Sequence, residues 1–374
     1  MARFALTDDQ RAFVRHVLDL AKTDLLPLAA QSEPGHVNRA LVAAMGRHGL
    51  LARVFGTAER TAMDLCLARE TLATVSTEAE TALALQGLGS YPFLQFGGED
   101  IVQRWRPTVL SGAAVAAFAL SEPGAGSDAA ALSLRAEPDG DGWRLFGEKM
   151  WISNAPEADV YSVFARTTPG TRAQGITAFV VSGDAAGLGG EPLDMLAPHP
   201  IGRLSFDGVR VGAADVLGEV DGGFSVAMRT LDLFRPSVGA FAVGMAQAAL
   251  DLTIAHTRQR QAFGNSLSKQ QAVSHMLADM ATRVEASRLL VYAAASAYDR
   301  GADAAEVTTR SAMAKLFSTE SAQFVVDAAV QLHGARALQR GHLLEHLYRE
   351  VRAPRIYEGA SEVQRTIIGR SLTR

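Results

Sequence analysis

The chain has 374 residues, of which 48% are hydrophobic and 20% charged, a balance typical of a globular protein with room for two or three cores. Its net charge of −4 gives no general attraction to nucleic acid or to an anionic membrane. The single cysteine, Cys66, excludes an internal disulfide and suits a reducing compartment. Acidic Asp8 and Asp9 do not fit a signal peptide, and the apolar stretches are too short or too interrupted for a membrane span. We therefore expect a cytoplasmic protein.

Helical spacing dominates the first third of the chain. Thr7 and Gln10 form a capping-box pattern, in which each side chain can bond the backbone of the other, so a helix is expected to begin there. Apolar residues then recur at helical spacing, with glycine or proline between the segments, over 13–25, 41–51, 62–74, 78–88 and 99–110. We expect a helical domain over residues 1–112.

Short runs typical of β-strands replace the helical pattern between residues 113 and 221. They cover 115–120, 143–146, 161–165, 176–181 and 204–211. The sequence Pro-Asp-Gly-Asp-Gly at 138–142 has the turn chemistry of a hairpin. Because no helical pattern separates the runs, we expect an antiparallel sheet or a small barrel and not βαβ units.

Long helical patterns return from residue 223 to the end of the chain. They cover 223–258, 268–300, 304–332, 338–350 and 361–372, and Arg235-Pro236 suggests a kink or a new helix start inside the first. Alanine-rich faces favour close packing, so a four-helix bundle is expected over 222–374, with wide apolar stripes able to bury against other subunits. The chain is thus predicted to be mainly α with a central antiparallel β-domain.

Glu358 is the candidate catalytic base. It lies between the bulky ring of Tyr357 and Gly359, just before the last predicted helix. Limited water around a carboxyl group raises its pKa from about 4.3 toward neutrality, where a base works best. An equal alternative is that Glu358 only stabilises the start of the last helix through the helix dipole.

The glycine-rich segment 124–129 formally matches the dinucleotide-binding pattern GxGxxA. A Rossmann turn must open a helix, whereas residues 132–135 and 143–146 favour β-structure, so this interpretation fails on context. A turn with exposed N–H groups and the hydroxyls of Ser121 and Ser127 still suits an anionic or heteroaromatic ligand. A purely structural turn is the alternative.

Two further motifs have a functional and a structural interpretation. His342-Leu-Leu-Glu-His346 matches the HxxEH pattern of zinc peptidases, but no third ligand is marked, and ordinary helix polarity is the default. The segment Arg258 to Gly264 combines arginines with Phe263, which suits phosphate binding with ring stacking, or equally a helix C-terminus with complementary charges.

Five segments, in order, resemble the acyl-CoA dehydrogenase family of flavoproteins, and the resemblance covers nearly the whole chain. They are LSEPGAGSD at 120–128, GEKMWISN at 147–154, RQAFG at 260–264, QLHG at 331–334 and YEG at 357–359. The resemblance implies an N-terminal helical domain (1–112), a barrel-like middle β-domain (113–221) and a C-terminal four-helix bundle (222–374), with FAD between the last two.

The resemblance also implies binding residues. Those implied for FAD are Leu120, Ser121, Gly126, Ser127, Trp151, Ser153, Arg260, Phe263, Leu267, Gln271, Gln331, Leu332, Gly334, Ala360 and Glu362. The four from Arg260 to Gln271 would reach the FAD of a neighbouring subunit. Those implied for the substrate are Ser127, Asp232, Arg235, Tyr357 and Gly359, and no metal is implied.

In the reaction that the resemblance implies, Glu358 removes the α-proton of an acyl-CoA or acyl-carrier thioester while the β-hydride passes to flavin N5, leaving a trans-2-enoyl thioester. The position at which some family members carry the base corresponds to Phe234. An electron-transferring flavoprotein is implied as electron acceptor and a homotetramer, a dimer of dimers, as the assembly, with a role in fatty acid metabolism. An oxidase or monooxygenase of the same fold and a non-catalytic flavin- or CoA-binding protein are the alternatives. A zinc hydrolase that uses His342 and His346 is a remote alternative.

Three departures from the family pattern stand out. Ala335 and Ala337 replace expected glycines, Phe118 stands where a tyrosine is common, and the loop at 53–57 is shortened. Such differences would suit an unusual acyl group or an acyl chain bound to a carrier protein.

Overall fold

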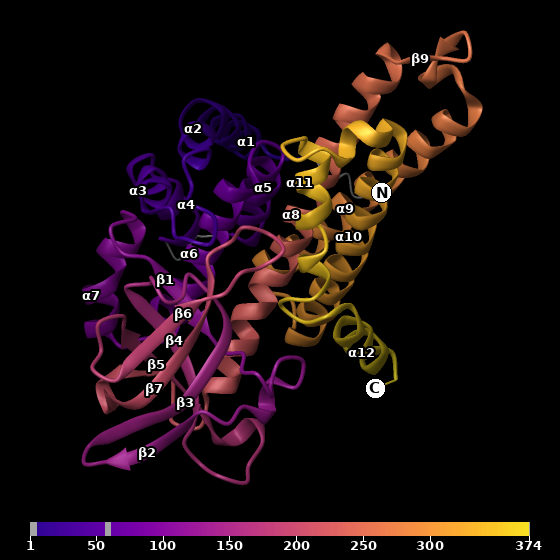
Figure 1. The fold of residues 1–374 in the computed structure, drawn as a ribbon. Helices are drawn as coiled ribbons and strands as arrows, with labels where there is room; N and C mark the ends of the chain where they lie inside the picture. The colour runs from indigo at the N-terminus through magenta and orange to yellow at the C-terminus, as the bar shows by residue number, and fades with distance from the viewer. Residues whose placement is uncertain (1–5, 57–60, 374) are drawn as a thin grey trace. The chain divides into compact units, whose positions relative to one another are not determined.

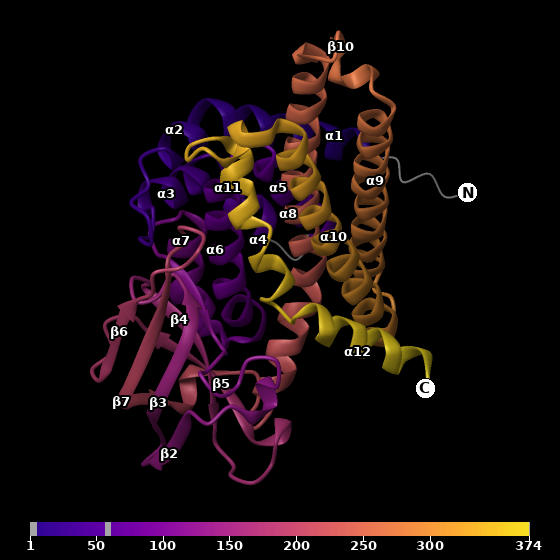
Figure 2. The same cartoon turned by 45° about the vertical axis from the view of Figure 1, so that its right-hand side comes forward.

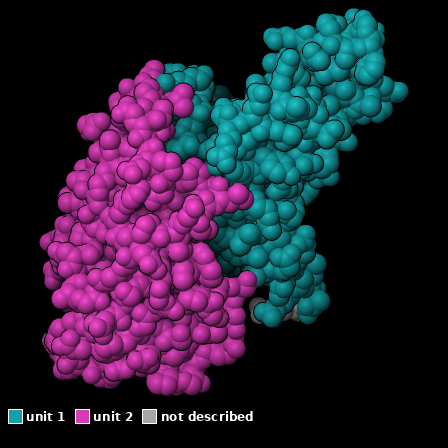
Figure 3. Space-filling view, in the orientation of Figure 1, with its two compact units in different colours: residues 1–22, 61–80, 232–374 teal, residues 23–60, 81–231 magenta. Residues whose placement is uncertain are grey.

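The computed structural model describes residues 6–56 and 61–373. The first five residues, part of the segment where no signal peptide is expected, and residue 57, the end of the shortened loop, lie outside the described residues. The chain forms two compact units, shown in different colours in Figure 3. Unit 1 consists of Met1–Lys22, Thr61–Glu80 and Asp232–Arg374, and unit 2 of Thr23–Arg60 and Thr81–Leu231.

Unit 2 carries short helices beside a sheet. The helices are α2 (Leu26–Ala29), α3 (Arg39–Arg47), α4 (Leu50–Phe55), α7 (Glu99–Leu110) and most of α6 (Thr77–Phe96). The helix predicted over 41–51 is divided into α3 and α4 by Gly49, whose φ is 73°. Helix α6 continues through Pro92 past its predicted end at residue 88, because most of its residues are buried and tertiary packing supports it.

The sheet of unit 2 has eight strands in the order β6-β7-β3-β2-β4-β5-β8, with β1 paired to β4 (Figure 1). The strands are β1 (Ala116–Ala119), β2 (Arg135–Asp139), β3 (Gly142–Ser153), β4 (Val160–Arg166), β5 (Ile176–Ser182), β6 (Leu188–Pro192), β7 (Ile201–Gly212) and β8 (Val216–Leu217). The predicted hairpin joins β2 to β3, with Asp139 opposite Gly142.

Two strand pairings depart from the expected antiparallel arrangement. Strand β4 runs parallel to both β1 and β2, so the sheet is mixed. Strand spacing in the sequence identifies which face of a strand is apolar, but the direction of a neighbour that is distant along the chain depends on long connections. The predicted fold class, mainly helical with a central β-domain, is confirmed.

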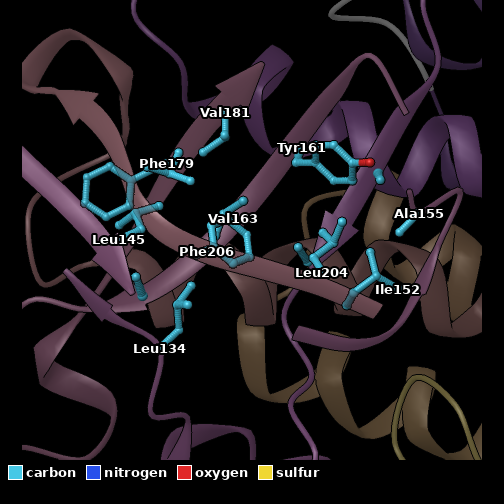
Figure 4. Packing of buried hydrophobic residues seen from close by; sticks show 14 of the residues in the cluster. Leu134, Leu145, Ile152, Ala155, Tyr161, Val163, Phe179, Val181, Leu204 and Phe206 are labelled. Carbon is cyan, nitrogen blue, oxygen red and sulfur yellow. The ribbon is translucent and has the colours of Figure 1, made fainter. Parts of the chain in front are cut away.

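Both faces of the central strands are buried. One apolar cluster gathers Leu145, Val163, Phe179, Leu204 and Phe206 on one face of the sheet (Figure 4). On the other face, Val160 and Phe164 pack with Phe93 of α6 and Val226 at the start of α8 (Gly223–Gln259). Successive side chains along β4 and β5 point to opposite faces of the sheet, which determines the cluster that each side chain joins.

Unit 1 is a bundle of long helices (Figure 2). It contains α1 (Asp8–Leu20), α5 (Ala62–Ala73), most of α8, α9 (Gln271–Asp299), α10 (Ala304–His333), α11 (Leu343–Glu350) and α12 (Ser361–Leu372), with the short strands β9 (Gln261–Ala262) and β10 (Asn265–Ser266) between α8 and α9. The capping box of Thr7 and Gln10 is present at the start of α1. Helix α11 begins five residues later than predicted, after a 3-10 turn at Gly334–Leu338.

Helix α8 runs unbroken through Pro236, so no new helix starts there. At Gly239 a Cβ atom would lie 2.8 Å from Val291 of α9, so glycine permits close approach of the two helices. By length and composition α8 could cross a membrane, but 67% of its most apolar window is buried inside the protein. It is therefore best described as the core helix of a bundle.

Candidate active site

Glu358 lies in a left-handed turn between α11 and α12. Its φ is 51° and that of Gly359 is 94°. For a glutamate such a backbone costs on the order of 1–2 kcal/mol, so surrounding contacts must support it. At Gly359 a Cβ atom would also approach Nε2 of Gln364 to 2.5 Å. The turn therefore requires glycine at position 359.

Three side chains from three helices hold the two carbonyl groups of this turn. Lys315 Nζ of α10 donates to the Gly359 carbonyl at 2.7 Å. Gln364 Nε2 of α12 donates to the same carbonyl at 2.9 Å and to the Glu358 carbonyl at 3.2 Å. Arg235 Nε of α8 donates to the Glu358 carbonyl at 3.3 Å. Donors that converge on consecutive carbonyls fix the backbone that aims the Glu358 side chain.

The Glu358 carboxyl group has the environment of a base. Its Oε2 atom is buried and has no hydrogen-bond partner among the residues that the structure describes. Burial raises the pKa of this carboxyl, although the charges of Arg69, Lys315 and Arg235 act in the opposite direction. A buried carboxylate with a free acceptor can take a proton from a ligand. The helix-dipole alternative gains no hydrogen bond here, because the start of α12 at Ala360 has no side-chain cap.

Arg69 and Glu80 form a buried ion pair whose cation interacts with Glu358. Arg69 is 2% exposed, and its Nη1 atom also donates to Ser237 Oγ at 2.6 Å. Sequence reasoning missed this pair, because α5 is buried on nearly every side and its spacing gives no inward direction. A single arginine within such an apolar helix was the only available signal.

Asp232 and Arg235, expected to contact substrate, are engaged with each other beside the turn. Arg235 Nη1 lies 3.1 Å from Asp232 Oδ1, and Thr308 Oγ1 donates to Asp232 Oδ2 at 2.9 Å. Burial raises the pKa of the Asp232 carboxyl. Their placement supports the Glu358 turn, and Phe234, between them, is fully buried.

In unit 2 a buried lysine forms hydrogen bonds that fix the segment beginning at Leu120. Lys149 Nζ of β3 donates to the Leu120 carbonyl at 2.9 Å and to Glu122 Oε1 at 2.8 Å. Glu122 also accepts bonds from the backbone N–H groups of Ser133 and Leu134. Burial lowers the pKa of the Lys149 ammonium to about 8, while Glu122 acts in the opposite direction. Lys149 and Glu122 therefore bond to each other and to the backbone, and they hold the segment that begins at Leu120 against β3.

Several residues predicted to bind the cofactor lie close in sequence to Leu120 or to Lys149. Trp151 has a φ of 58° and is 50% exposed, at a register shift in β3 between Lys149 and Ile152. The hydroxyls of Ser121, Ser127 and Ser153 make no hydrogen bond to other residues within 6–56 and 61–373. No atom lies within 4 Å of a Cβ placed at Gly126. The 3-10 turn Ala129–Ala131 that follows is not the helix a Rossmann turn requires.

The remaining predicted cofactor residues lie at opposite ends of the unit 1 helices (Figures 1 and 2). Arg260, Phe263, Leu267 and Gln271 follow the end of α8 around β9 and β10, and Phe263 is 93% exposed with a φ of 52°. Gln331, Leu332 and Gly334 lie at the C-terminal end of α10. Ala360 and Glu362 lie at the start of α12, beside Glu358. Of these residues, Ala360 and Glu362 adjoin the candidate base in the chain.

The replacements at 335 and 337 lie in the 3-10 turn that follows Gly334. Gly334 keeps a positive φ of 65° as the cap of α10, and Ala337 is buried. Phe118 of β1 packs on Phe164, with ring centroids 4.9 Å apart. A tyrosine hydroxyl is therefore not needed to hold this strand.

The two histidines of the HxxEH pattern have different partners. His342 precedes α11 and its Nδ1 accepts a bond from Leu344 N–H. His346 Nε2 lies 2.6 Å from Thr77 Oγ1. Within the described ranges no group of three or more metal-binding side chains gathers. The pattern serves the start and the packing of α11, which disfavours the zinc hydrolase interpretation.

Three descriptions of one family match the chain in order. "Acyl-CoA dehydrogenase, N-terminal domain" matches residues 7–113, "middle domain" matches 117–209 and "C-terminal domain" matches 221–373. A probable acyl-CoA dehydrogenase of Mycobacterium bovis is 36% identical over 375 residues, covering 98% of this chain and 95% of that protein. The fold and these matches define an oxidoreductase that depends on a flavin. The chain belongs to the acyl-CoA dehydrogenase family.

Solved structures share the whole fold. Butyryl-CoA dehydrogenase of Megasphaera elsdenii superposes with a TM-score of 0.93 at 32% identity, covering 99% of this chain and 100% of that one. A chain from work on the electron transferring flavoprotein of Acidaminococcus fermentans has a TM-score of 0.93 at 33% identity, covering 99% of each chain.

The buried Lys149 and Glu122 pair generates a stability prediction. Lys149→Met should lower the free energy of unfolding by about 3–5 kcal/mol, because Glu122 would stay buried without its cation. Arg144→Met, on the same strand, removes a half-exposed pair with Asp139 and should cost about 1 kcal/mol or less. Urea unfolding of both variants measures the difference, and equal losses would contradict this role of Lys149.

Proposed function

We propose that this protein dehydrogenates an acyl thioester, carried by CoA or by an acyl carrier protein, to the trans-2-enoyl thioester, with FAD as cofactor and Glu358 as base. The observation that carries the proposal is the buried Glu358 carboxyl, whose Oε2 atom has no hydrogen-bond partner among the described residues and whose turn is held by donors from three helices. Family membership supports the reaction class, and a butyryl-CoA dehydrogenase among the solved relatives supports a thioester substrate.

The residues present fit FAD. Trp151 offers a half-exposed indole for stacking, and three serine hydroxyls have no hydrogen-bond partner in the described part of the chain. Phe263 adds an exposed ring, and Arg260, three residues earlier in the chain, adds a charge. The residues that would hold FAD are Leu120, Ser121, Gly126, Ser127, Trp151, Ser153, Arg260, Phe263, Leu267, Gln271, Gln331, Leu332, Gly334, Ala360 and Glu362. When bound, FAD supplies the acceptor for the β-hydride.

Glu358 would act at both its side chain and its backbone. Its carboxylate takes the α-proton, and the charges of Arg69, Lys315 and Arg235 oppose the effect of burial by favouring the ionised form. Its N–H has no acceptor among the described residues, so it is free to bond the thioester carbonyl and stabilise the developing enolate. The residues proposed to bind the substrate are Ser127, Asp232, Arg235, Tyr357 and Gly359.

The remaining assignments are also proposals. An electron-transferring flavoprotein is the proposed electron acceptor, in fatty acid metabolism in the cytoplasm. A homotetramer is proposed because Phe263 is almost fully exposed at the end of the bundle, where a neighbouring subunit could cover it. We keep the domain boundaries 1–112, 113–221 and 222–374 as part of this proposal.

Glu358→Gln should bind FAD and thioester normally but slow anaerobic bleaching of the flavin by at least about 100-fold, because only the proton acceptor is removed. Glu285→Gln, at an exposed glutamate of α9, is the matched control and should bleach at the normal rate. The measurement is stopped-flow absorbance with butyryl-CoA and a panel of longer, branched and aromatic acyl-CoAs. An unchanged rate in Glu358→Gln would refute the assignment of the base. Reduced enzyme that reoxidises rapidly in air would favour the oxidase alternative.

Phe263→Ala should weaken FAD retention and oligomer integrity together, since one exposed ring is proposed to serve both. Gel filtration with light scattering gives the assembly, and absorbance of the eluted peak gives the FAD content. Leu196→Ala, at another exposed apolar residue, is the control and should change neither. Full FAD content and an intact oligomer in Phe263→Ala would count against a cofactor shared between subunits.

A further inference from the structure

Lys315 is a buried cation to which no carboxylate is bonded within residues 6–56 and 61–373. It lies in the middle of α10 and is 0% exposed. Among the described residues its Nζ makes a single hydrogen bond, to the Gly359 carbonyl at 2.7 Å. Burial of an ammonium group is costly unless an opposite charge or strong hydrogen bonds compensate for lost water. A well-packed apolar side chain at this position would avoid that cost, so the charge itself needs a physical explanation.

The acidic group that most favours the charged form of Lys315 is Glu358. Burial lowers the pKa of the Lys315 ammonium to about 8, and the attraction of the Glu358 carboxylate is the largest opposing effect. Lys315 in turn is one of three cations that favour the ionised form of Glu358. The strongest attraction on the ammonium therefore comes from the candidate base, ahead of those from Glu320 and Glu362.

Lys315 also acts on the backbone of the base. The Gly359 carbonyl that it holds belongs to the residue directly after Glu358, where the chain is left-handed on both sides of the peptide. A charge-assisted hydrogen bond at this carbonyl is stronger than a neutral one. Loss of the bond would free the turn that directs the carboxyl group.

Resting on the function proposed above, we infer that Lys315 is a positioning residue for Glu358, which holds the turn through the Gly359 carbonyl and keeps the buried carboxylate ionised. Other charged groups surround the pair from every element packed against the turn. They are Arg69 of α5, Glu80 of α6, Asp232 and Arg235 of α8, Glu320 of α10, Glu350 of α11 and Glu362 of α12. These stay in place when Lys315 alone is replaced, so its own effect can be isolated.

The direction of the effect follows from charge. A cation near a carboxylate lowers the pKa of that carboxylate, so removing the cation raises it. The Lys315 ammonium, with a pKa of about 8, is charged throughout the acidic range in which a carboxyl group titrates. When an uncharged residue replaces Lys315, the pH at which Glu358 loses its proton should therefore rise by about one unit relative to the parent protein.

Three variants separate the charge of Lys315 from its hydrogen bond. Lys315→Gln keeps a donor without the charge, Lys315→Met removes both, and Lys315→Arg keeps the charge. Lys22→Met, at an exposed lysine of the same unit, is the control. If Lys315→Met fails to fold, Lys315→Gln still tests the inference, because its amide can bond the Gly359 carbonyl.

The decisive readout is independent of turnover. Infrared difference spectra of the holoenzyme against Glu358→Gln give the band of the protonated Glu358 carboxyl, whose pH midpoint can be followed in each variant. We expect the midpoint to rise by about one pH unit in Lys315→Gln and Lys315→Met and to stay within the parent range in Lys315→Arg and Lys22→Met. An unchanged midpoint in Lys315→Gln would overturn the inference, whether or not the protein oxidises any thioester.

A second readout tests the positioning role. Anaerobic flavin reduction by butyryl-CoA, measured from about pH 5 to pH 9, should show the same upward shift of its acidic limb in the neutral variants. The limiting rate in Lys315→Met should fall by roughly tenfold or more with little change in the half-saturating butyryl-CoA concentration, because the base moves while binding persists. A parent protein that neither acyl-CoA nor acyl-carrier thioesters reduce would refute the proposed function, while the infrared midpoints would still decide the role of Lys315.

Discussion

The structure depends on a strained turn that aims one carboxyl group. Glu358 and Gly359 adopt left-handed backbone conformations, and Lys315, Gln364 and Arg235 support their carbonyl groups from three different helices. Strain of this kind persists only where surrounding contacts compensate for it. The packing of the long helices of unit 1 therefore places the three donor side chains at the turn that carries Glu358. A few hydrogen bonds to the backbone of this turn therefore set the direction of the Glu358 side chain.

A buried lysine that donates to a backbone carbonyl also occurs in unit 2. Lys149, buried in β3, donates to the Leu120 carbonyl just as Lys315 donates to the Gly359 carbonyl, and burial lowers the pKa of each ammonium to about 8. The two lysines differ in their partners. Lys149 is bonded to Glu122 and forms a closed structural pair, whereas Lys315 has no bonded carboxylate among the described residues. From this difference we infer that Lys149 stabilises the fold, whereas Lys315 acts on the proposed base.

Much of the fold could be predicted from the sequence, because capping boxes, helical spacing and turn residues act locally. Thr7 and Gln10 marked the start of α1, and 138–142 marked the β2–β3 hairpin correctly. The parallel pairing of β4 with β1 and β2 could not be predicted, since it joins strands that are distant along the chain. Glu358 was predicted as a base from its neighbours in sequence, whereas the positions of Arg69, Glu80 and Lys315 around it were not, because they lie on helices with weak apolar periodicity.

The proposed reaction requires that the Glu358 carboxyl group reaches the α-carbon of a bound thioester. The sharpest test is a crystal structure of the holoenzyme with a thioester analogue that cannot lose a β-hydride. We expect a Glu358 oxygen about 3 Å from that α-carbon, with the turn at 358 and 359 in its left-handed form. An analogue whose α-carbon faces another acidic or basic group, with Glu358 directed away, would contradict it.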